Sequence, residues 1–121
     1  MATDDEQKKA LWMIKAVYED GEAEINGRVY KFLGTTHAKR KKVFAFFSSI
    51  QGEITSGNFS FIDAPAFKGV EDTINSIVAF DDSLISKLEN HWEKYPEDYM
   101  KFISVSMGVI SYPFLKGSLT A

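Results

Sequence analysis

The chain has 121 residues, of which 45% are hydrophobic and 26% charged, and this is typical of one globular domain with its own core. Its 14 basic and 17 acidic residues give a net charge of −3, so the chain as a whole has no electrostatic attraction to nucleic acid or anionic lipid. The absence of cysteine excludes disulfides, thiol catalysis and zinc–thiolate sites. We expect a single domain over residues 1–121 that binds neither nucleic acid nor membranes.

The N-terminal region is charged where an export signal would be apolar, and residues 1–9 are expected to be disordered. In residues 10–18, ALWMIKAVY, the apolar positions follow helical spacing, and we favour a short helix over the alternative of a strand. The longest uncharged run, residues 102–115, is shorter than the roughly 20 apolar residues of a membrane span. These features predict a soluble, intracellular protein.

Residues 22–33 have the pattern of a β-hairpin. Two runs in which apolar and polar residues alternate lie on either side of Asn26 and Gly27. This dipeptide readily adopts the positive φ angles of a type I′ turn, which joins two antiparallel strands. The sequence therefore predicts an antiparallel pair of strands with a two-residue turn.

A helix is expected to follow, with Thr36 as its cap and Ile50 near its end. At about 100° per residue, one apolar stripe of this helix faces the core and consists of Val43, Phe46, Phe47 and Ile50. The four basic residues 39–42 are spread around the helix, which indicates a solvated helix start and not a surface that reads nucleic acid. Phe44 lies off the stripe, so either the hairpin or the N-terminal segment covers it, or it contacts a partner.

The middle of the chain begins with a predicted loop, residues 51–67, in which Phe59 and Phe61 alternate with polar residues as in a short strand. Apolar residues at helical spacing then predict an amphipathic helix whose buried face is Phe67, Val70, Ile74, Ile77 and Val78.

The C-terminal part is expected to hold two further helices. Asp81 or Asp82 would cap a short helix whose apolar residues are Leu84, Ile85 and Leu88. The last helix would start at Pro96 and end at about Ser111, before Pro113. The prediction is an α+β fold: an N-terminal antiparallel β-hairpin, then a small, mainly α-helical region, residues 36–115, of about four helices.

No residue pattern indicates a catalytic, cofactor or metal site. His37 and His91 are far apart in sequence and are expected to be surface or capping residues. The acidic pairs, Asp81-Asp82 and Glu97-Asp98, are placed at helix starts, where the helix dipole favours negative charge. The glycines are scattered singly, so there is no phosphate loop. We expect a protein that is not an enzyme and has no cofactor.

The last helix carries small residues at Ser104, Gly108 and Ser111, which share one face. Such a face lets another helix approach closely. The sequence leaves open whether that helix belongs to the same chain or to a second subunit.

Four segments together resemble the tail assembly chaperones of long-tailed, siphovirus-like phages and prophages. INGRVYKF followed by THAKRKKVFAFFSSI is similar to the opening of that family, in which a short hairpin leads into a basic helix. FDDSLISKLENHWEKYPEDYMKFI and the closing ISYPFL are similar to the helical second half of the family. The resemblance spans most of residues 22–115, and it transfers no catalytic or position-specific binding residue.

The resemblance implies a protein of the host cytoplasm that binds the tape measure protein and keeps it soluble for tail tube assembly. Longer, frameshifted forms in this family recruit the tail tube protein, and a chain ending at KGSLTA corresponds to the short form. The alternatives are a phage structural or head–tail joining protein, and a small nucleic-acid-associated regulator.

The surplus of phenylalanine predicts a contact surface. The 10 phenylalanines outnumber the 5 tyrosines and 2 tryptophans, and each must be buried in the core or against a partner. The core stripes do not explain the aromatic residues Phe44, Phe59, Phe61, Tyr112 and Phe114. We expect these residues to bind the tape measure protein or a second copy of the chain in a homo-oligomer.

Overall fold

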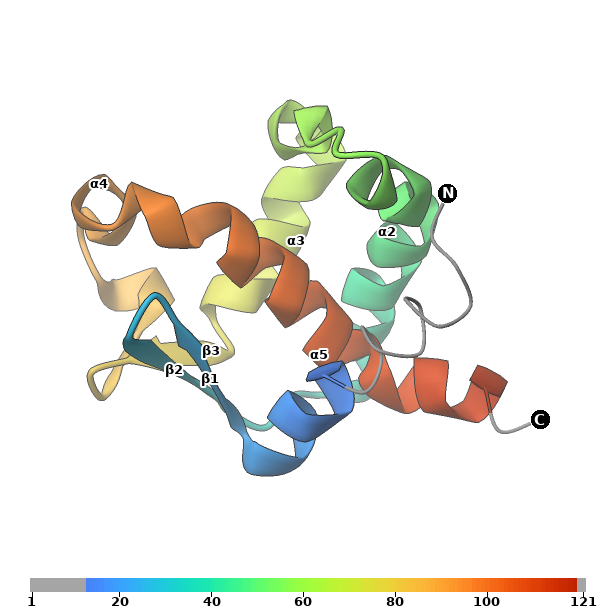
Figure 1. The fold of residues 1–121 in the computed structure, drawn as a ribbon, viewed down its shortest axis with the longest axis horizontal. Helices are drawn as coiled ribbons and strands as arrows, with labels where there is room; N and C mark the ends of the chain where they lie inside the picture. The colour runs from blue at the N-terminus through green and yellow to red at the C-terminus, as the bar shows by residue number, and fades with distance from the viewer. Residues whose placement is uncertain (1–12, 120–121) are drawn as a thin grey trace.

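The computed structural model describes residues 13–119, with side chains through residue 116 (Figure 1). Residues 13–20 are helical, which confirms the predicted helix as far as it lies within the described residues. The expectation of disorder for residues 1–9 and the start of that helix at residue 10 lie outside them. We call residues 13–20 the N-terminal helix.

The predicted hairpin is present. Strand β1 (Glu22–Ile25) pairs antiparallel with β2 (Arg28–Phe32). The turn residues Asn26 and Gly27 have φ angles of 52° and 82°, as a type I′ turn requires. Alternation along β2 points Tyr30 inward, where its side chain is fully buried.

A second hairpin, which the sequence reasoning missed, extends the sheet. Strands β3 (Val78–Phe80) and β4 (Ser83–Leu84) complete an antiparallel sheet in the order β1-β2-β3-β4. Asp81 and Asp82 form the tight turn between them, with φ angles of 51° and 65°. The prediction that these aspartates cap a helix is therefore wrong. Aspartate tolerates left-handed backbone, so it also occupies hairpin turns.

Helix α2 (His37–Thr55) starts as predicted, because the Thr36 hydroxyl accepts a hydrogen bond from the Lys39 backbone N–H at 3.2 Å. The predicted core stripe is confirmed at Val43, Phe47 and Ile50, which are buried, while Phe46 is half-buried and packs against the same core. The helix is longer than predicted, since residues 51–55 are helical and not part of a loop. Half-buried Ile54 packs on the core and extends the apolar stripe by one turn.

The basic residues at the start of α2 differ in their surroundings. Lys39, Lys41 and Lys42 are exposed, as expected for a solvated helix start. Arg40 instead reaches α5, where its Nη1 donates a hydrogen bond to the Ile110 carbonyl at 2.7 Å. This residue therefore joins two helices.

The segment after α2 forms two helical elements. Phe59 and Phe61 do not form a strand: Phe61 lies in a 3-10 helix, η1 (Ser60–Asp63), and Phe59 directly precedes it. Helix α3 (Pro65–Asn75) buries Phe67, Val70 and Ile74, as the spacing predicts. It ends before Ile77 and Val78, which are buried in the turn and in β3 instead. A short apolar run is compatible with either a helix or a strand, and here pairing with β2 decides for the strand.

Short helical turns connect the sheet to the last helix. The predicted helix around Leu84, Ile85 and Leu88 is only a 3-10 turn, η2 (Ile85–Lys87). Helix α4 (His91–Lys94) follows. The chain then forms η3 (Pro96–Asp98), with proline at its first turn as expected.

Helix α5 (Tyr99–Leu119) continues through Pro113, so the predicted end near Ser111 is wrong. Proline has no N–H to donate to the carbonyl four residues earlier, which usually ends or kinks a helix. Here Tyr112 is buried and Leu115 packs against the core, and this packing favours helix on both sides of the proline.

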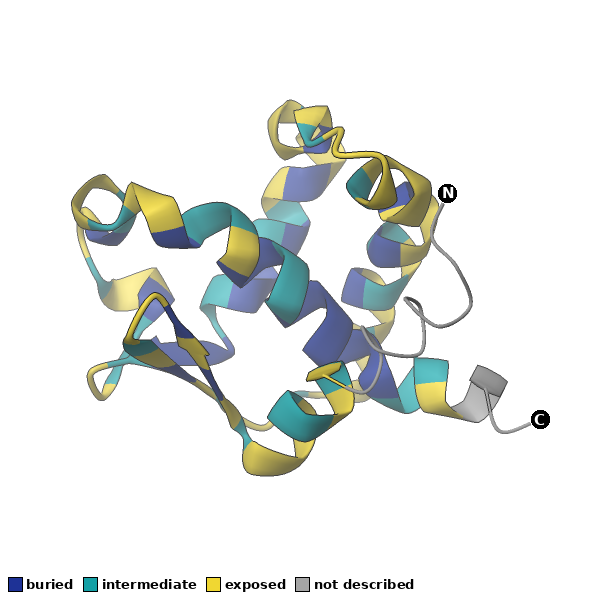
Figure 2. Ribbon diagram, in the orientation of Figure 1, coloured by how far each residue is buried: buried dark blue, intermediate teal, exposed yellow. Residues whose placement is uncertain are grey.

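The fold is α+β, and α5 crosses its middle (Figure 1). Helices α2 and α3 lie on one side of α5, and the sheet and the N-terminal helix on the other. Burial is deepest along the middle of α5 (Figure 2), where Phe102, Ile103 and Met107 are fully buried.

Candidate functional site

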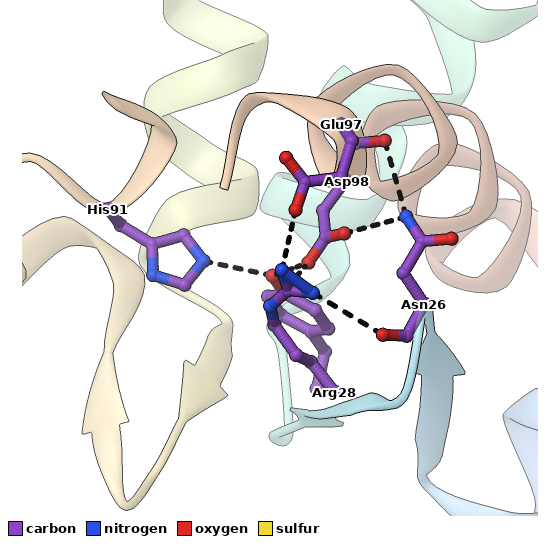
Figure 3. Close-up of polar contacts among 6 residues, drawn as sticks. Asn26, Arg28, His91, Glu97 and Asp98 are labelled. Carbon is purple, nitrogen blue, oxygen red and sulfur yellow. Dashed lines mark hydrogen bonds and ion pairs between the residues drawn. The ribbon is translucent and has the colours of Figure 1, made fainter. Parts of the chain in front are cut away.

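A cluster of polar side chains joins the β-hairpin to the segment before α5 (Figure 3). The hairpin turn and β2 supply three of them, while α4 and η3 supply the others. We call the cluster the polar latch, and its members are Asn26, Arg28, Tyr30, His91, Glu97 and Asp98. The positive φ of Asn26 places its side chain toward η3, with Nδ2 2.7 Å from Asp98 Oδ1.

Asp98 is the centre of the polar latch and is 0% exposed. Its Oδ2 accepts a hydrogen bond from the Tyr30 hydroxyl at 2.7 Å and lies 3.5 Å from Arg28 Nε. Its Oδ1 accepts from Asn26. A buried carboxylate is tolerated only when it is paired and hydrogen-bonded, and Asp98 meets both conditions.

Tyr30 links Asp98 to His91. The Tyr30 hydroxyl lies 2.9 Å from His91 Nε2. Because this hydroxyl donates its proton to Asp98, it accepts from His91, which places the imidazole proton on Nε2. Burial lowers the pKa of His91, so the neutral ring is favoured, although the Asp98 carboxylate opposes this effect.

The outer side of the polar latch is formed by Arg28. Its Nη2 pairs with Glu97 Oε1 at 2.5 Å, and its Nη1 donates to the Asn26 carbonyl at 3.3 Å. Its guanidinium carbon lies 4.0 Å from the centre of the Tyr95 ring, which is a cation–π contact. The Arg28 guanidinium therefore lies over the buried Asp98 carboxylate and is itself held by Glu97, the Asn26 carbonyl and the Tyr95 ring.

The chemistry of the polar latch is that of a structural fastening. Burial, together with the hydrogen bond to Asp98, raises the pKa of Tyr30, which is opposite to the direction that would make a phenolate base or nucleophile. A shallow depression of about 380 Å³ lies beside it, lined by His91 and Trp92 with Asp72, Asn75 and Glu93 among others. Among residues 13–119, no group of three or more histidines and carboxylates is placed to hold a metal ion.

Sequence reasoning missed the polar latch and the burial of two of its members. His91 was expected to be a surface or capping residue but is 6% exposed, and its ring lies among Tyr30, Phe80 and Trp92. Asp98 was expected at a helix start, and it lies there in η3, but its full burial was not predicted. The available signal was Tyr30, since a tyrosine on the inward face of a strand needs a hydrogen-bond partner. The sequence does not say which residue that partner is.

The predicted contact residues separate into two groups. Phe44 and Phe114 form one pair, half-buried between α2 and α5 with ring centres 5.1 Å apart. Phe59 and Phe61 form another at η1, with ring centres 6.3 Å apart. Phe44 thus packs against Phe114 of α5. Residues 1–12 of the N-terminal segment that was expected to cover it lie outside the described residues.

Two of the predicted contact residues are core residues in this conformation. Phe61 is 5% exposed and Tyr112 is 6% exposed, because each packs on aromatic neighbours of the same chain. The predicted surface is thereby narrowed to Phe44, Phe59 and Phe114, all half-buried. Their role in binding stays a prediction.

The small-residue face of α5 is occupied by the chain itself. A Cβ atom added at Gly108 would lie 2.5 Å from Ile14 Cδ1, so the N-terminal helix packs directly on this glycine. Four residues further along both helices, the Tyr18 and Tyr112 rings are 5.1 Å apart. The two contacts are thus four residues apart on both helices. We call Gly108 and Tyr112 the α5 seam.

A scan against protein-family models and searches of curated proteins and of solved structures found no match to this chain. Within the described residues, none of the helices is long and apolar enough to cross a membrane.

Proposed function

We propose that this protein is a tail assembly chaperone of a long-tailed phage or prophage. It would act in the host cytoplasm, bind the tape measure protein and keep it soluble until the tail tube assembles. The resemblance of residues 22–115 to that family supports the proposal. The family is expected to have a short hairpin that leads into a basic helix, and β1, β2 and α2 of this chain have that arrangement.

The observation that carries the proposal is the α5 seam. It holds an amphipathic helix, the N-terminal helix, through Ile14 on Gly108 and Tyr18 on Tyr112. A tape measure protein is long and helical, and its apolar stripes need cover of this kind before assembly. A groove that binds a helix contacts apolar residues spaced three or four positions apart, and Ile14 and Tyr18 are four positions apart.

The half-buried aromatic residues extend the proposed binding surface. Phe44, Phe59 and Phe114 each retain exposed area on the described part of the chain. Aromatic side chains concentrate binding energy at protein interfaces, and truncating a hot spot costs about 2 kcal/mol or more. We propose that several copies of the chain self-associate and cover one client together.

The test is co-expression with the tape measure protein encoded in the same phage genome. We expect the chain to move that protein from the insoluble to the soluble fraction and to co-purify with it. Folded variants with Phe44, Phe59 or Phe114 replaced singly by serine are expected to recover less client. If the wild-type chain leaves the tape measure protein insoluble, the proposal is wrong; if the chain is found in purified phage particles, it is a joining protein instead.

A further inference from the structure

We propose that the N-terminal helix is a displaceable cover of the α5 seam, and that an amphipathic helix of the client takes its place. This inference rests on the proposed function, and it assigns the site and the kind of segment that binds there. The client segment is a helix with a branched aliphatic residue against Gly108 and, four positions later, an aromatic residue against Tyr112.

The α5 seam is shaped for a helix that lies close. Gly108 has no side chain, and the Ile14 side chain fills the space where its Cβ would be, with Cγ1 at 3.2 Å and Cδ1 at 2.5 Å from that position. Tyr112 provides a flat aromatic surface for the ring of Tyr18. Both residues of the α5 seam are buried, and Ile14 and Tyr18 of the N-terminal helix pack on them.

The residues of the N-terminal helix are less buried than the α5 residues that they cover. No residue from 13 to 20 is buried: Ile14, Ala16 and Val17 are half-buried, and the others are exposed. Met13 and Tyr18 are 64% and 40% exposed. An ion pair within residues 13–20, Lys15 with Glu19 at 3.8 Å, joins two exposed residues of the same helix and does not fasten it to α5.

The chain after the N-terminal helix allows it to move away without disturbing the hairpin. Gly21 follows the helix with φ +75°, and a Cβ atom there would meet nothing within 4 Å. Beyond Gly21 the hairpin is held by the polar latch, which shares no residue with the α5 seam. The Gly21 carbonyl accepts a hydrogen bond from the Phe32 N–H at 2.8 Å, which holds Gly21 on the hairpin. Release of residues 13–20 alone therefore exposes apolar surface on α5 while the hairpin keeps its contacts with the polar latch.

The first experiment locks the N-terminal helix with a disulfide in the full chain, using the double variant Ile14→Cys/Gly108→Cys. Cγ1 and Cγ2 of Ile14 lie 3.2 and 3.7 Å from the added Gly108 Cβ, so two cysteines there approach the geometry of a disulfide. The chain has no other cysteine. The readout is light scattering of the tape measure protein diluted from denaturant, with the oxidised or the reduced variant present.

Both substitutions alter the α5 seam or its cover, so the oxidised variant is compared with its own reduced form. We expect the oxidised form to need at least about tenfold more protein than the reduced form for the same suppression of aggregation. Equal protection by both forms would overturn the inference while leaving the proposed function in place. If neither the wild type nor the reduced variant protects, the proposed function fails, and this inference fails with it.

The second experiment releases the N-terminal helix. Ile14→Ser removes its contact with Gly108, and we expect half-maximal protection at roughly three to ten times lower protein concentration, because less free energy opposes opening. Lys15→Ser, an exposed position on the same helix, is the matched control and should behave as wild type. An Ile14→Ser variant that stays folded and protects no better than Lys15→Ser would contradict the inference.

Discussion

The β-hairpin and the N-terminal helix are neighbours in sequence, yet they are attached to the rest of the fold by opposite means. The hairpin is fastened by the polar latch, in which the buried Asp98 carboxylate accepts hydrogen bonds from Tyr30 and Asn26. The N-terminal helix is attached by apolar contacts at its half-buried face. A buried polar network is directional and loses much when one member leaves, whereas an apolar contact accepts any side chain of suitable shape. From this comparison we infer that the hairpin stays attached through the polar latch, whereas another helix can replace the N-terminal helix.

The largest expected effect is at the centre of the polar latch. Asp98→Ala leaves Tyr30 and Asn26 without their acceptor and Arg28 without its buried counter-charge. We expect a loss of about 3 to 5 kcal/mol in the free energy of unfolding, the range for breaking a buried ion pair. Urea denaturation measures it.

Glu97→Ala is the matched control, because Glu97 is the adjacent acid, pairs with the same arginine, and has a side chain that is 52% exposed. It should lose no more than about 1 kcal/mol. Similar losses for the two variants would show that burial of Asp98 is not what fastens the hairpin.

The next largest loss of stability is expected at the turn that contains Asn26 and Gly27. Gly27→Val forces a β-branched residue to a φ of 82°, and we expect a loss of about 1 kcal/mol or more. Gly34→Val is the control, since its φ lies outside the left-handed region and its Cβ meets nothing within 4 Å. Thermal unfolding of the two variants, compared with wild type, tests the turn; an unchanged melting temperature for Gly27→Val would contradict it.

The polar latch also predicts a pH dependence. Burial lowers the pKa of His91 below its unfolded value of about 6.5, with Asp98 opposing and Arg28 and Lys94 assisting the shift. The unfolded chain therefore binds more protons than the folded one as pH falls below that value. Stability is fully present above about pH 6.5 and decreases as pH falls through the folded pKa.

Denaturation at several pH values measures this contribution. In His91→Gln, the free energy of unfolding should fall less steeply than in wild type between about pH 7 and 5. In His37→Gln, at an exposed position, it should fall as in wild type. If the stability of His91→Gln depends on pH as that of the wild type does, the pKa of His91 is the same in the folded and unfolded chain.

The smallest effect is expected at the N-terminal helix. Ile14→Ala removes a half-buried contact on Gly108, so the loss should be about 1 kcal/mol or less. Met13→Ala, at a position 64% exposed, is the control and should be neutral. A loss at Ile14 as large as that at Asp98 would remove the distinction between the two attachments.

The first hairpin was predictable because Asn26-Gly27 is a strong local turn signal, and the start of α2 because Thr36 is a strong cap. The second hairpin was not, since aspartate serves both as a helix cap and as a left-handed turn residue, and pairing of β3 with β2 decides between them. The same holds for Pro113, where tertiary packing outweighs a local breaking signal.

The polar latch depends entirely on contacts between distant parts of the chain. Tyr30 and Asp98 are 68 positions apart, so no local pattern connects them. The small-residue face of α5 was visible in the sequence, but its occupant was not. Only the packing of Ile14 on Gly108 shows that the chain covers this face itself.

Native-state hydrogen exchange tests the contrast between the two attachments most directly. In the wild-type chain, we expect the amides of the N-terminal helix to exchange through local opening, at least about a hundredfold faster than those of Tyr30 and Phe32 in β2. The β2 amides should exchange only with global unfolding. Equal protection of the two regions would contradict the account, because the N-terminal helix would then open only when the whole fold does.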